Sequence, residues 1–460
     1  MSKVNPYIYY SDFDQAWLGE LPSHWQVMRT KLLFDLVTEF APVGNSEELL
    51  SVYTAIGVKP RKELEARGNK ASSTDNYWRV QQGDIIVNKL LAWMGAIGIS
   101  EYNGVTSPAY DILRPKENVN PYYYNFLFRN PIASREFKRH SRGIMDMRLR
   151  LYFTRFGDIK LPLPPMEEQF KFVEYLKFKL NKIDRFIRKK KQLIKLLNEQ
   201  KASIINNAVT KGLNPKAKMN SSGIEWLGEI PEHWEVKKLK YSVRLNIHKE
   251  LESVENSEIK IALENIESKT GRILEFSTNP FEGIGTIFKP GDVLFGKLRP
   301  YLAKVIAPDF EGSCVNEILV LSPNQEIWHS VFLKYRMLSS DFIGIVDNST
   351  YGAKMPRASW NFIGDLKISC PPKNEQIEIT DTIEEEHKEI NYIISTIEKE
   401  IALTQEYRTA LIAEAVTGKV DVRDFVIPEE KEEEIYEELE EELSLAAEGE
   451  AEYETDENPD

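Results

Sequence analysis

The chain has 460 residues, of which 42% are hydrophobic, and a formal net charge of −13. This length predicts about three folding units, and the absence of any run of roughly 18 or more apolar residues excludes a transmembrane helix. The first residues, MSKVNPYIYYSDFD, lack the apolar stretch of a signal peptide. The only cysteines, Cys314 and Cys370, exclude a disulfide framework or a zinc-binding spacing, so we expect a cytoplasmic protein.

The negative charge is concentrated at the end of the sequence. Residues 427–460 hold 17 Asp and Glu and one Lys, a net −16, which leaves +3 for residues 1–426. We expect this tail to be solvated and without a packed fold. A solubilising appendage is the preferred interpretation, and a tail that shields a basic surface or docks a partner is the alternative. The rest of the chain is compatible with a nucleic-acid partner.

A short motif opens each half of the sequence. Residues 17–25 read WLGELPSHW, and residues 226–234, at an offset of 209, read WLGEIPEHW. A repeat at this distance indicates a duplicated chain. His24 and His233 lie beside a Trp with no Cys, His or carboxylate at metal-ligand spacing. We therefore interpret both as turn-packing residues, in preference to catalytic or metal-binding ones.

A mixed α/β domain is predicted after each motif. Between residues 26 and 163, strand signals occur in SVYTAI, GDIIVN, GAIGIS and AYDILR, and a helix is expected from Tyr122 to Phe137. Residues 235–370 repeat the plan, because GDVLFGKL at 291 answers GDIIVNKL at 83. The spacing is too irregular to predict the strand order.

Two long helices are predicted, at residues 167–209 and 375–416. Each follows a Pro-Pro pair, starts with Glu-Gln, contains no interior Gly or Pro, and ends on Ala-Val-Thr. Their apolar residues alternate at spacings of three and four, the seam of a coiled coil. The seam is interrupted by Lys190, Lys201, His387, Thr404 and Arg408.

The charges of these helices favour pairing. The first has 11 Lys and Arg against 5 Asp and Glu, and the second has 3 against 11. Net charges of +6 and −8 predict that the helices clasp each other. At about 1.5 Å per residue each would span roughly 60 Å.

The expected fold class is therefore α+β, with an internal pseudo-two-fold duplication. Two mixed α/β domains are separated by two long antiparallel helices that form a coiled coil. The predicted segments are the first motif and domain at 1–163, the first helix at 164–213, the second motif and domain at 214–370, the second helix at 371–426 and the tail at 427–460.

Catalytic motifs are missing from the sequence. It contains no nucleotide-binding G-x-x-x-x-G-K-[ST] loop and no G-x-G-x-x-G opening a helix. It also contains no G-x-S-x-G elbow and no H-E-x-x-H zinc motif. We expect no cofactor, no metal and no catalytic residue in this chain.

Basic and aromatic residues alternate in loops at matching places of both domains. Lys and Arg neutralise phosphates, and Arg or Asn can read base edges. In the first domain the loop HSRGIMDMRLR carries Arg142, Arg148 and Arg150, and in the second domain STYGAKMPRAS carries Lys354 and Arg357. Both loops place a Gly, a Met and an Arg in order, at 143–148 and 352–357. The predicted DNA-binding residues are Asn88, Lys89, Tyr110, Arg142, Arg148, Lys297, Arg299, Tyr301, Lys354 and Arg357.

Several of these motifs together resemble the specificity subunits of type I restriction-modification systems. They are WLGEIPEHWEVKKLK at 226, GDVLFGKLRPYLAKV at 291, YGAKMPRASWNFIGDLKISCPPKNEQ at 351, INNAVTKGL at 205 and IAEAVTGKVDVR at 412. The resemblance covers residues 10–425 and leaves out the acidic tail.

The resemblance implies a function. Each α/β domain would be a target-recognition domain that reads one half of a bipartite double-stranded DNA site. The helices would space the domains and dock two modification subunits, which methylate adenine with S-adenosylmethionine. Restriction subunits, where present, would use ATP with Mg. The unlike loops GIMDMR and GAKMPR predict an asymmetric site.

Two other classes of protein stay open at this point. One is a coiled-coil scaffold that joins two protein-binding domains and has no role with DNA. The other is a fused methyltransferase or nuclease with a degenerate active site, against which the missing cofactor motifs argue.

Overall fold

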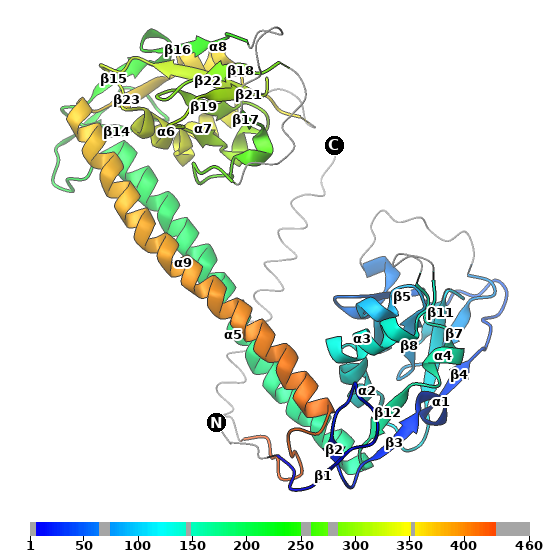
Figure 1. Ribbon diagram of the computed structural model, residues 1–460. Coiled ribbons are helices and arrows are strands. Elements are labelled where there is room, and N and C mark those ends of the chain that lie inside the picture. Colours follow the sequence, from blue (N-terminus) through cyan, green and yellow to red (C-terminus); the bar gives the residue numbers. More distant parts are fainter. Residues whose placement is uncertain are drawn as a thin grey trace. The chain divides into compact units, whose positions relative to one another are not determined.

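The structure is a computed structural model that describes residues 6–63, 74–143, 149–249, 259–274, 284–350 and 355–428. It divides into two compact units, which we describe separately. Unit 1 is Met1–Ile187 together with Ile401–Asp460, and unit 2 is Arg188–Glu400. Each unit combines one α/β domain with one stretch of each long helix (Figure 1).

The described elements follow the same plan in both halves of the chain. The first half contains β1 (Tyr10–Ser11), β2 (Leu21–Pro22), β3 (Gln26–Arg29), α1 (Thr30–Leu33), β4 (Phe34–Val37), β5 (Leu50–Tyr53), β6 (Gly57–Pro60), β7 (Trp78–Val80), β8 (Ile85–Asn88), β9 (Ile97–Ile99), β10 (Gly104–Thr106), β11 (Tyr110–Pro115), α2 (Pro121–Phe128), α3 (Pro131–His140), α4 (Phe153–Phe156), β12 (Lys160–Leu163) and α5 (Met166–Lys211). The second half contains β13 (Met219–Ser221), β14 (Glu229–Pro231), β15 (Glu235–Lys238), β16 (Val243–Asn246), β17 (Lys260–Ile261), β18 (Thr286–Phe288), β19 (Val293–Gly296), β20 (Val305–Ile306), β21 (Gly312–Cys314), β22 (Ile318–Pro323), α6 (Ser330–Leu338), α7 (Ser340–Asp347), α8 (Trp360–Asp365), β23 (Lys367–Cys370) and α9 (Lys373–Val416).

A four-stranded antiparallel sheet forms the centre of each α/β domain. Its order is β4-β11-β8-β9 in unit 1 and β16-β22-β19-β20 in unit 2. The strand that follows each opening motif pairs with the strand that precedes each long helix, as β3 with β12 and β15 with β23. The fold class predicted from the sequence is confirmed, and so are the four strands predicted in the first domain, which are β5, β8, β9 and β11.

The single helix predicted from Tyr122 to Phe137 is two helices, α2 and α3. Pro131 has no backbone N–H and cannot continue a helix from the preceding turn. The Asn130 side chain instead accepts a hydrogen bond from the backbone N of Ile132 and caps the start of α3. After the break α3 packs against α2 and α4, where buried Phe137 meets Phe128 and Phe156 with ring centroids 5.8 and 5.2 Å apart.

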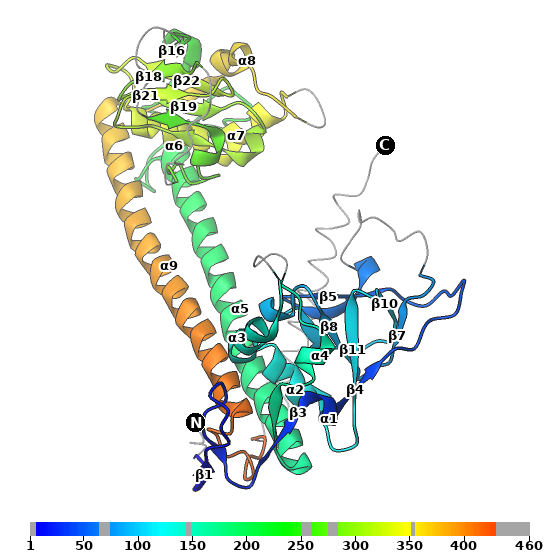
Figure 2. The same ribbon diagram turned by 45° about the vertical axis from the view of Figure 1, so that its right-hand side comes forward.

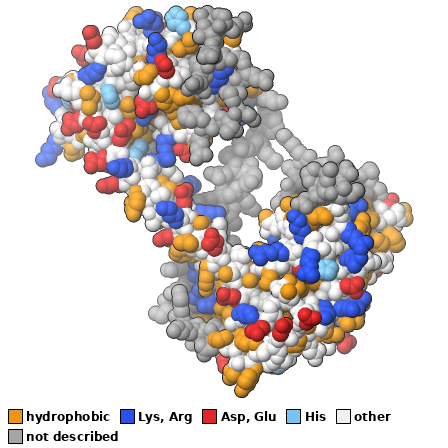
Figure 3. All heavy atoms as spheres, viewed as in Figure 1, with side chains coloured by type: hydrophobic (Ala, Val, Ile, Leu, Met, Phe, Trp, Pro, Cys, Tyr) orange, Lys and Arg blue, Asp and Glu red, His pale blue; other side chains and the backbone are white. Residues whose placement is uncertain are grey.

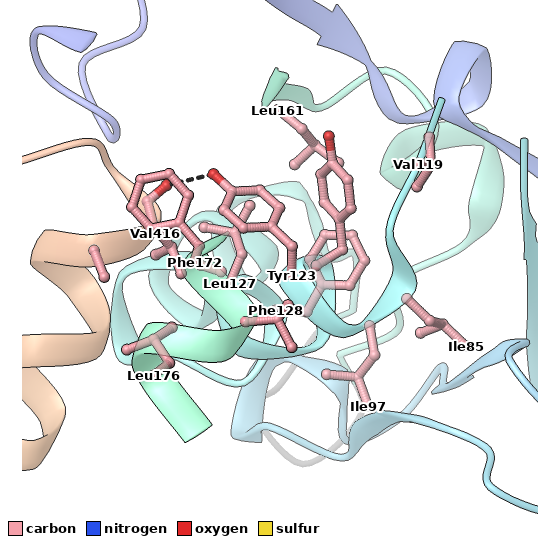
Figure 4. Packing of buried hydrophobic residues seen from close by; sticks show 14 of the residues in the cluster. Ile85, Ile97, Val119, Tyr123, Leu127, Phe128, Leu161, Phe172, Leu176 and Val416 are labelled. Carbon is pink, nitrogen blue, oxygen red and sulfur yellow. Dashed lines mark hydrogen bonds between the residues drawn. The ribbon is translucent and has the colours of Figure 1, made fainter. Parts of the chain in front are cut away.

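Aromatic side chains fill the core of unit 1 (Figure 4). Tyr123 of α2 packs against Phe172 of α5, with ring centroids 5.8 Å apart. Its hydroxyl donates a hydrogen bond of 2.8 Å to the carbonyl of Val416, at the end of α9. Burying each such ring contributes about 1.5–3 kcal/mol, so the domain and the ends of both helices share one core.

The two long helices pair in antiparallel fashion. In unit 1 Asp184 of α5 meets Arg408 of α9 at 3.2 Å. In unit 2 Lys190 meets Glu400 at 2.8 Å. Residue numbers therefore rise along α5 in the direction in which they decrease along α9. Figures 1 and 2 show the same pairing from two directions. Within the described ranges, no helix is long and apolar enough to cross a membrane.

The polar interruptions of the predicted seam find partners across the helix pair. Buried Lys201 donates a hydrogen bond of 2.8 Å to Asn391 Oδ1. The Nε2 atom of buried His387 lies 3.2 Å from the carbonyl oxygen of Lys201. Buried polar groups are tolerated when they are satisfied, and here the interruptions of one helix meet polar groups of the other.

A carboxylate clamp joins each opening motif to the start of a long helix. In unit 1 Trp25 Nε1 donates to Glu168 Oε2 at 3.0 Å, and His24 Nε2 lies 2.7 Å from Glu168 Oε1. In unit 2 Trp234 Nε1 donates to Glu375 Oε1 at 3.0 Å. His233 closes the second clamp at 2.8 Å, so both histidines hold a helix start.

The glutamine that follows each clamping glutamate fixes the domain to the same helix turn. Gln169 accepts a hydrogen bond of 2.8 Å from the backbone N of Asn120, which caps α2. Gln376 accepts the equivalent bond of 2.8 Å from the backbone N of His329, which precedes α6. The Glu-Gln pair therefore sets where each α/β domain attaches to its helix.

Candidate nucleic-acid interface

Three loops converge at one end of the sheet in unit 1. Strand β8 ends at Asn88, whose Oδ1 accepts a hydrogen bond of 3.0 Å from the backbone N of Leu90 and turns the chain. Asn88 lies opposite Tyr110, the first residue of β11. The carbonyl of Lys89 accepts a bond of 2.8 Å from the backbone N of Leu151, which brings the loop before α4 to the same place.

The cations of this cluster differ in exposure. Lys89 Nζ lies 3.2 Å from Asp111 Oδ1 and donates a bond of 2.8 Å to the carbonyl of Pro108, so only 20% of its side chain is exposed. Burial raises the pKa of Asp111 above its ordinary value, although Lys89 acts in the opposite direction. Arg142 and Arg150 are exposed and their backbones pair with each other at 3.0 and 2.9 Å. Arg142 and Arg150 therefore face solvent, whereas Lys89 beside them is held by Asp111.

The same convergence occurs in unit 2. The carbonyl of Lys297 accepts a bond of 2.8 Å from the backbone N of Ala358, and the backbone N of Lys297 donates to the carbonyl of Glu317 at 2.9 Å. Arg357 follows as an exposed cation whose guanidinium binds the Glu317 carboxylate at 3.1 Å. That contact raises the pKa of Arg357 above its ordinary value, so the guanidinium stays charged.

Equivalent residues in the two domains can be assigned from these backbone bonds. The backbone bond from Leu151 to Lys89 corresponds to the bond from Ala358 to Lys297. Lys89 is therefore equivalent to Lys297, and Arg150 is equivalent to Arg357. The spacing of Gly and Arg in the sequence had paired Arg148 with Arg357. The first loop is two residues longer between its glycine and this backbone bond, which explains the difference. Arg150, which lies in the predicted loop but not in the predicted set, is therefore a further candidate for this interface.

A short 3-10 turn from Pro300 to Leu302 adds two exposed side chains to the interface of unit 2. Arg299 before it has φ +51°, a left-handed conformation that costs about 1–3 kcal/mol in a residue with a side chain. The backbone N of Arg299 donates a bond of 2.8 Å to the carbonyl of Pro356, which holds this conformation. Tyr301 in the turn is 45% exposed, so its ring is available to a ligand.

The predicted residues thus gather at the same place in each domain. Asn88, Lys89, Tyr110 and Arg142 meet in unit 1, and Lys297, Arg299 and Arg357 meet in unit 2. Arg148 and Lys354 lie outside the described residues. Figure 3 shows Lys and Arg side chains interspersed with Asp and Glu on the visible face. The candidate interface is therefore defined by the residues of these loops.

The side chains of these loops suit binding more than bond making. They are cations, amides and phenols, which neutralise phosphates and donate hydrogen bonds to base edges. Among the described residues, no group of three or more His, Cys, Asp or Glu could hold a metal ion. The contacts that this arrangement offers are those of a polyanion-binding surface.

Comparison with known proteins agrees with the fold and the duplication. Residues 22–196 match the family described as the type I restriction modification DNA specificity domain. Over 357 residues the chain is 23% identical to the type I restriction enzyme EcoDI specificity subunit of Escherichia coli, covering 72% of this chain and 77% of the relative. It is 24% identical over 431 residues to the type I restriction enzyme MjaVIII specificity subunit of Methanocaldococcus jannaschii, covering 88% and 94%.

A solved structure shares the fold. It is described as "Structural basis underlying complex assembly and conformational transition of the type I R-M system", and one of its chains superposes with a TM-score of 0.64 at 14% identity. The match covers 87% of this chain and 99% of the other. Fold and interface together define a duplicated recognition protein, with one loop cluster in each α/β domain. The chain is similar in sequence to type I restriction-modification specificity subunits over most of its length.

Proposed function

We propose that this chain is the DNA sequence-recognition subunit of a type I restriction-modification complex and acts in the cytoplasm. Each α/β domain reads one half of an asymmetric bipartite site in duplex DNA. The observation that carries the proposal is one backbone frame, built twice, that presents Lys89 with Arg150 in one domain and Lys297 with Arg357 in the other. Tyr110 is the first residue of β11, and the equivalent first residue of β22 is Ile318. Equal frames with unequal side chains fit two different half-sites.

The paired helices are the proposed docking surface for two modification subunits, one on each unit. In unit 1 Leu403 and Tyr407 of α9 are 65% and 56% exposed. In unit 2 Tyr392 and Ile393 of α9 are 73% and 45% exposed. Exposed apolar clusters on a helix surface mark protein interaction sites. In this proposal the partners supply S-adenosylmethionine and the methylation of adenine, while restriction subunits supply ATP-dependent cleavage with Mg, and this chain has no catalytic residue.

The recognition role is tested with the full chain assembled with its modification subunits. Wild-type complex is expected to bind duplex DNA with a steep salt dependence and to methylate adenines in one bipartite sequence. Arg357→Ala should cost about 1–3 kcal/mol and relax the sequence at one position of one half-site. Binding without sequence preference, or an Arg357→Ala complex with an unchanged methylation pattern, would count against the assignment. A scaffold without a DNA role predicts no salt-dependent binding.

The docking role is tested separately on α9. Replacing both Leu403 and Tyr407 by Glu is expected to abolish co-purification of one of the two modification subunits, because charged groups would be buried in the contact. Gln405→Glu adds charge between them on another side of the helix and serves as the control. Retention of both subunits by the Leu403/Tyr407 variant would contradict this role.

A further inference from the structure

The two interfaces have equivalent cations, but a carboxylate binds a different one of these cations in each interface. In unit 1 the lysine is held, because Lys89 Nζ lies 3.2 Å from Asp111 Oδ1. In unit 2 the arginine is held, because Arg357 binds Glu317. Among the described residues, no carboxylate pairs with Arg150, which contacts the hydroxyl of Tyr152 at 3.4 Å.

The carboxylates come from the same turn and the strand that follows it. Residues 107–110 and 315–318 form equivalent turns, each closed by a backbone bond of 3.0 Å between the first and last residue. The turn position of Glu317 is occupied by Ala109 in unit 1, and the strand position of Asp111 by Leu319 in unit 2. A shift of the carboxylate by two positions therefore changes which cation is held.

The contact with Glu317 uses one particular edge of the guanidinium. Arg357 Nε donates to the carboxylate oxygens at 3.1 and 3.3 Å, and Nη2 donates to Oε1 at 3.2 Å. The edge formed by Nη1 and the second hydrogen of Nη2 stays available. Two parallel N–H groups at this spacing match the O6 and N7 acceptors of guanine. A carboxylate beside them also disfavours an approaching phosphate by charge repulsion.

We propose that Glu317 is a specificity-determining residue, which holds Arg357 so that its free edge reads a guanine in the half-site bound by unit 2. This inference rests on the proposed function. Arg150 has no such carboxylate and can turn to bind a phosphate. The equivalent arginines therefore have different roles in the two domains. The positions 109 and 317 are thereby switch points between base reading and backbone contact.

The test uses the full chain with its modification subunits and duplexes that differ from the recognised site by one base pair at a time. Wild-type complex should show a guanine in one half-site whose replacement weakens binding. Glu317→Gln should reduce that penalty by about tenfold, leave the other positions unchanged, and bind unrelated DNA more tightly. Arg357→Lys keeps the charge but loses the fork, so it should lose the same penalty.

Glu326→Gln is the matched control. Glu326 is exposed beyond the opposite end of β22, so the variant changes the charge of the same unit without touching Arg357. It should keep the full guanine penalty, and all variants should retain the thermal unfolding midpoint of the wild type. A Glu317→Gln complex that discriminates like Glu326→Gln, or an Arg357-dependent position that is not guanine, would overturn the inference alone. A wild-type complex without any preferred sequence would overturn the proposed function with it.

Discussion

The clamp on Glu168 gives a prediction whose size follows from the hydrogen bonds. Glu168 accepts from the hydroxyl of Tyr7 at 2.7 Å and from Trp25 Nε1 at 3.0 Å, and both donors are buried, at 4% and 2% exposure. Burial first, and then the bond to Glu168, raise the pKa of the Tyr7 phenol far above its ordinary value, so it remains a donor. Among the described residues, Glu375 accepts from one buried donor, the indole of Trp234.

Replacement by alanine should therefore affect the two units unequally. A buried donor left without an acceptor costs about 1–3 kcal/mol, so Glu168→Ala should cost about 2–6 kcal/mol and Glu375→Ala about 1–3 kcal/mol. Native-state hydrogen exchange along the first turns of α5 and of α9 measures each opening free energy in the full chain. Glu168→Gln keeps one acceptor oxygen and should recover part of the loss. If Glu375→Ala destabilised its unit as much as Glu168→Ala does, the reasoning from buried donors would be refuted.

Two further predictions concern acid sensitivity and a close contact. Burial lowers the pKa of His387 from 6.5 to about 4, so unfolded chains take up a proton first and stability is lost as the pH falls from 6.5 to about 4. His387→Gln should flatten this loss in urea unfolding, and an equal acid loss in both proteins would contradict it. Gly418 has φ +67°, and a Cβ there would lie 2.9 Å from Trp25 Cη2. Gly418→Ala should lower the free energy of unfolding by about 1–2 kcal/mol for the backbone conformation and by about 1–3 kcal/mol more for the clash. Gly223 has φ +69° and nothing within 4 Å of an added Cβ, so Gly223→Ala should lose only the first amount. Equal losses in the two variants would refute the clash.

Local patterns in the sequence were sufficient for the two long helices, four strands of the first domain and the duplication. Helix periodicity and the absence of interior Pro and Gly decide α5 and α9, because these signals act over neighbouring residues. The break at Pro131 was missed, although the Asn130-Pro131 pair is a local signal for the start of a new helix.

Contacts between distant residues could not be derived in this way. The clamp joins Trp25 to Glu168 across 143 positions, and no periodicity relates them. The residue equivalent to Arg357 in the first domain depends on such distant contacts as well. A loop can gain two residues without changing its neighbours, so Arg148 matched by sequence spacing while Arg150 matches by backbone position. The choice of cation held by Asp111 or Glu317 depends on that same three-dimensional register.

The division of the chain has a consequence for the order in which it folds during synthesis. Unit 2 is one uninterrupted segment, Arg188–Glu400, whereas unit 1 needs residues from Ile401 onward. Tyr123 finds its acceptor at Val416, so the ribosome must make the chain as far as the end of α9 before the first domain is complete. Although domains generally fold in the order of their synthesis, here the domain made second has all its parts first. Until α9 is made, the first domain lacks the α9 residues of its core, which include Leu411 and Val416.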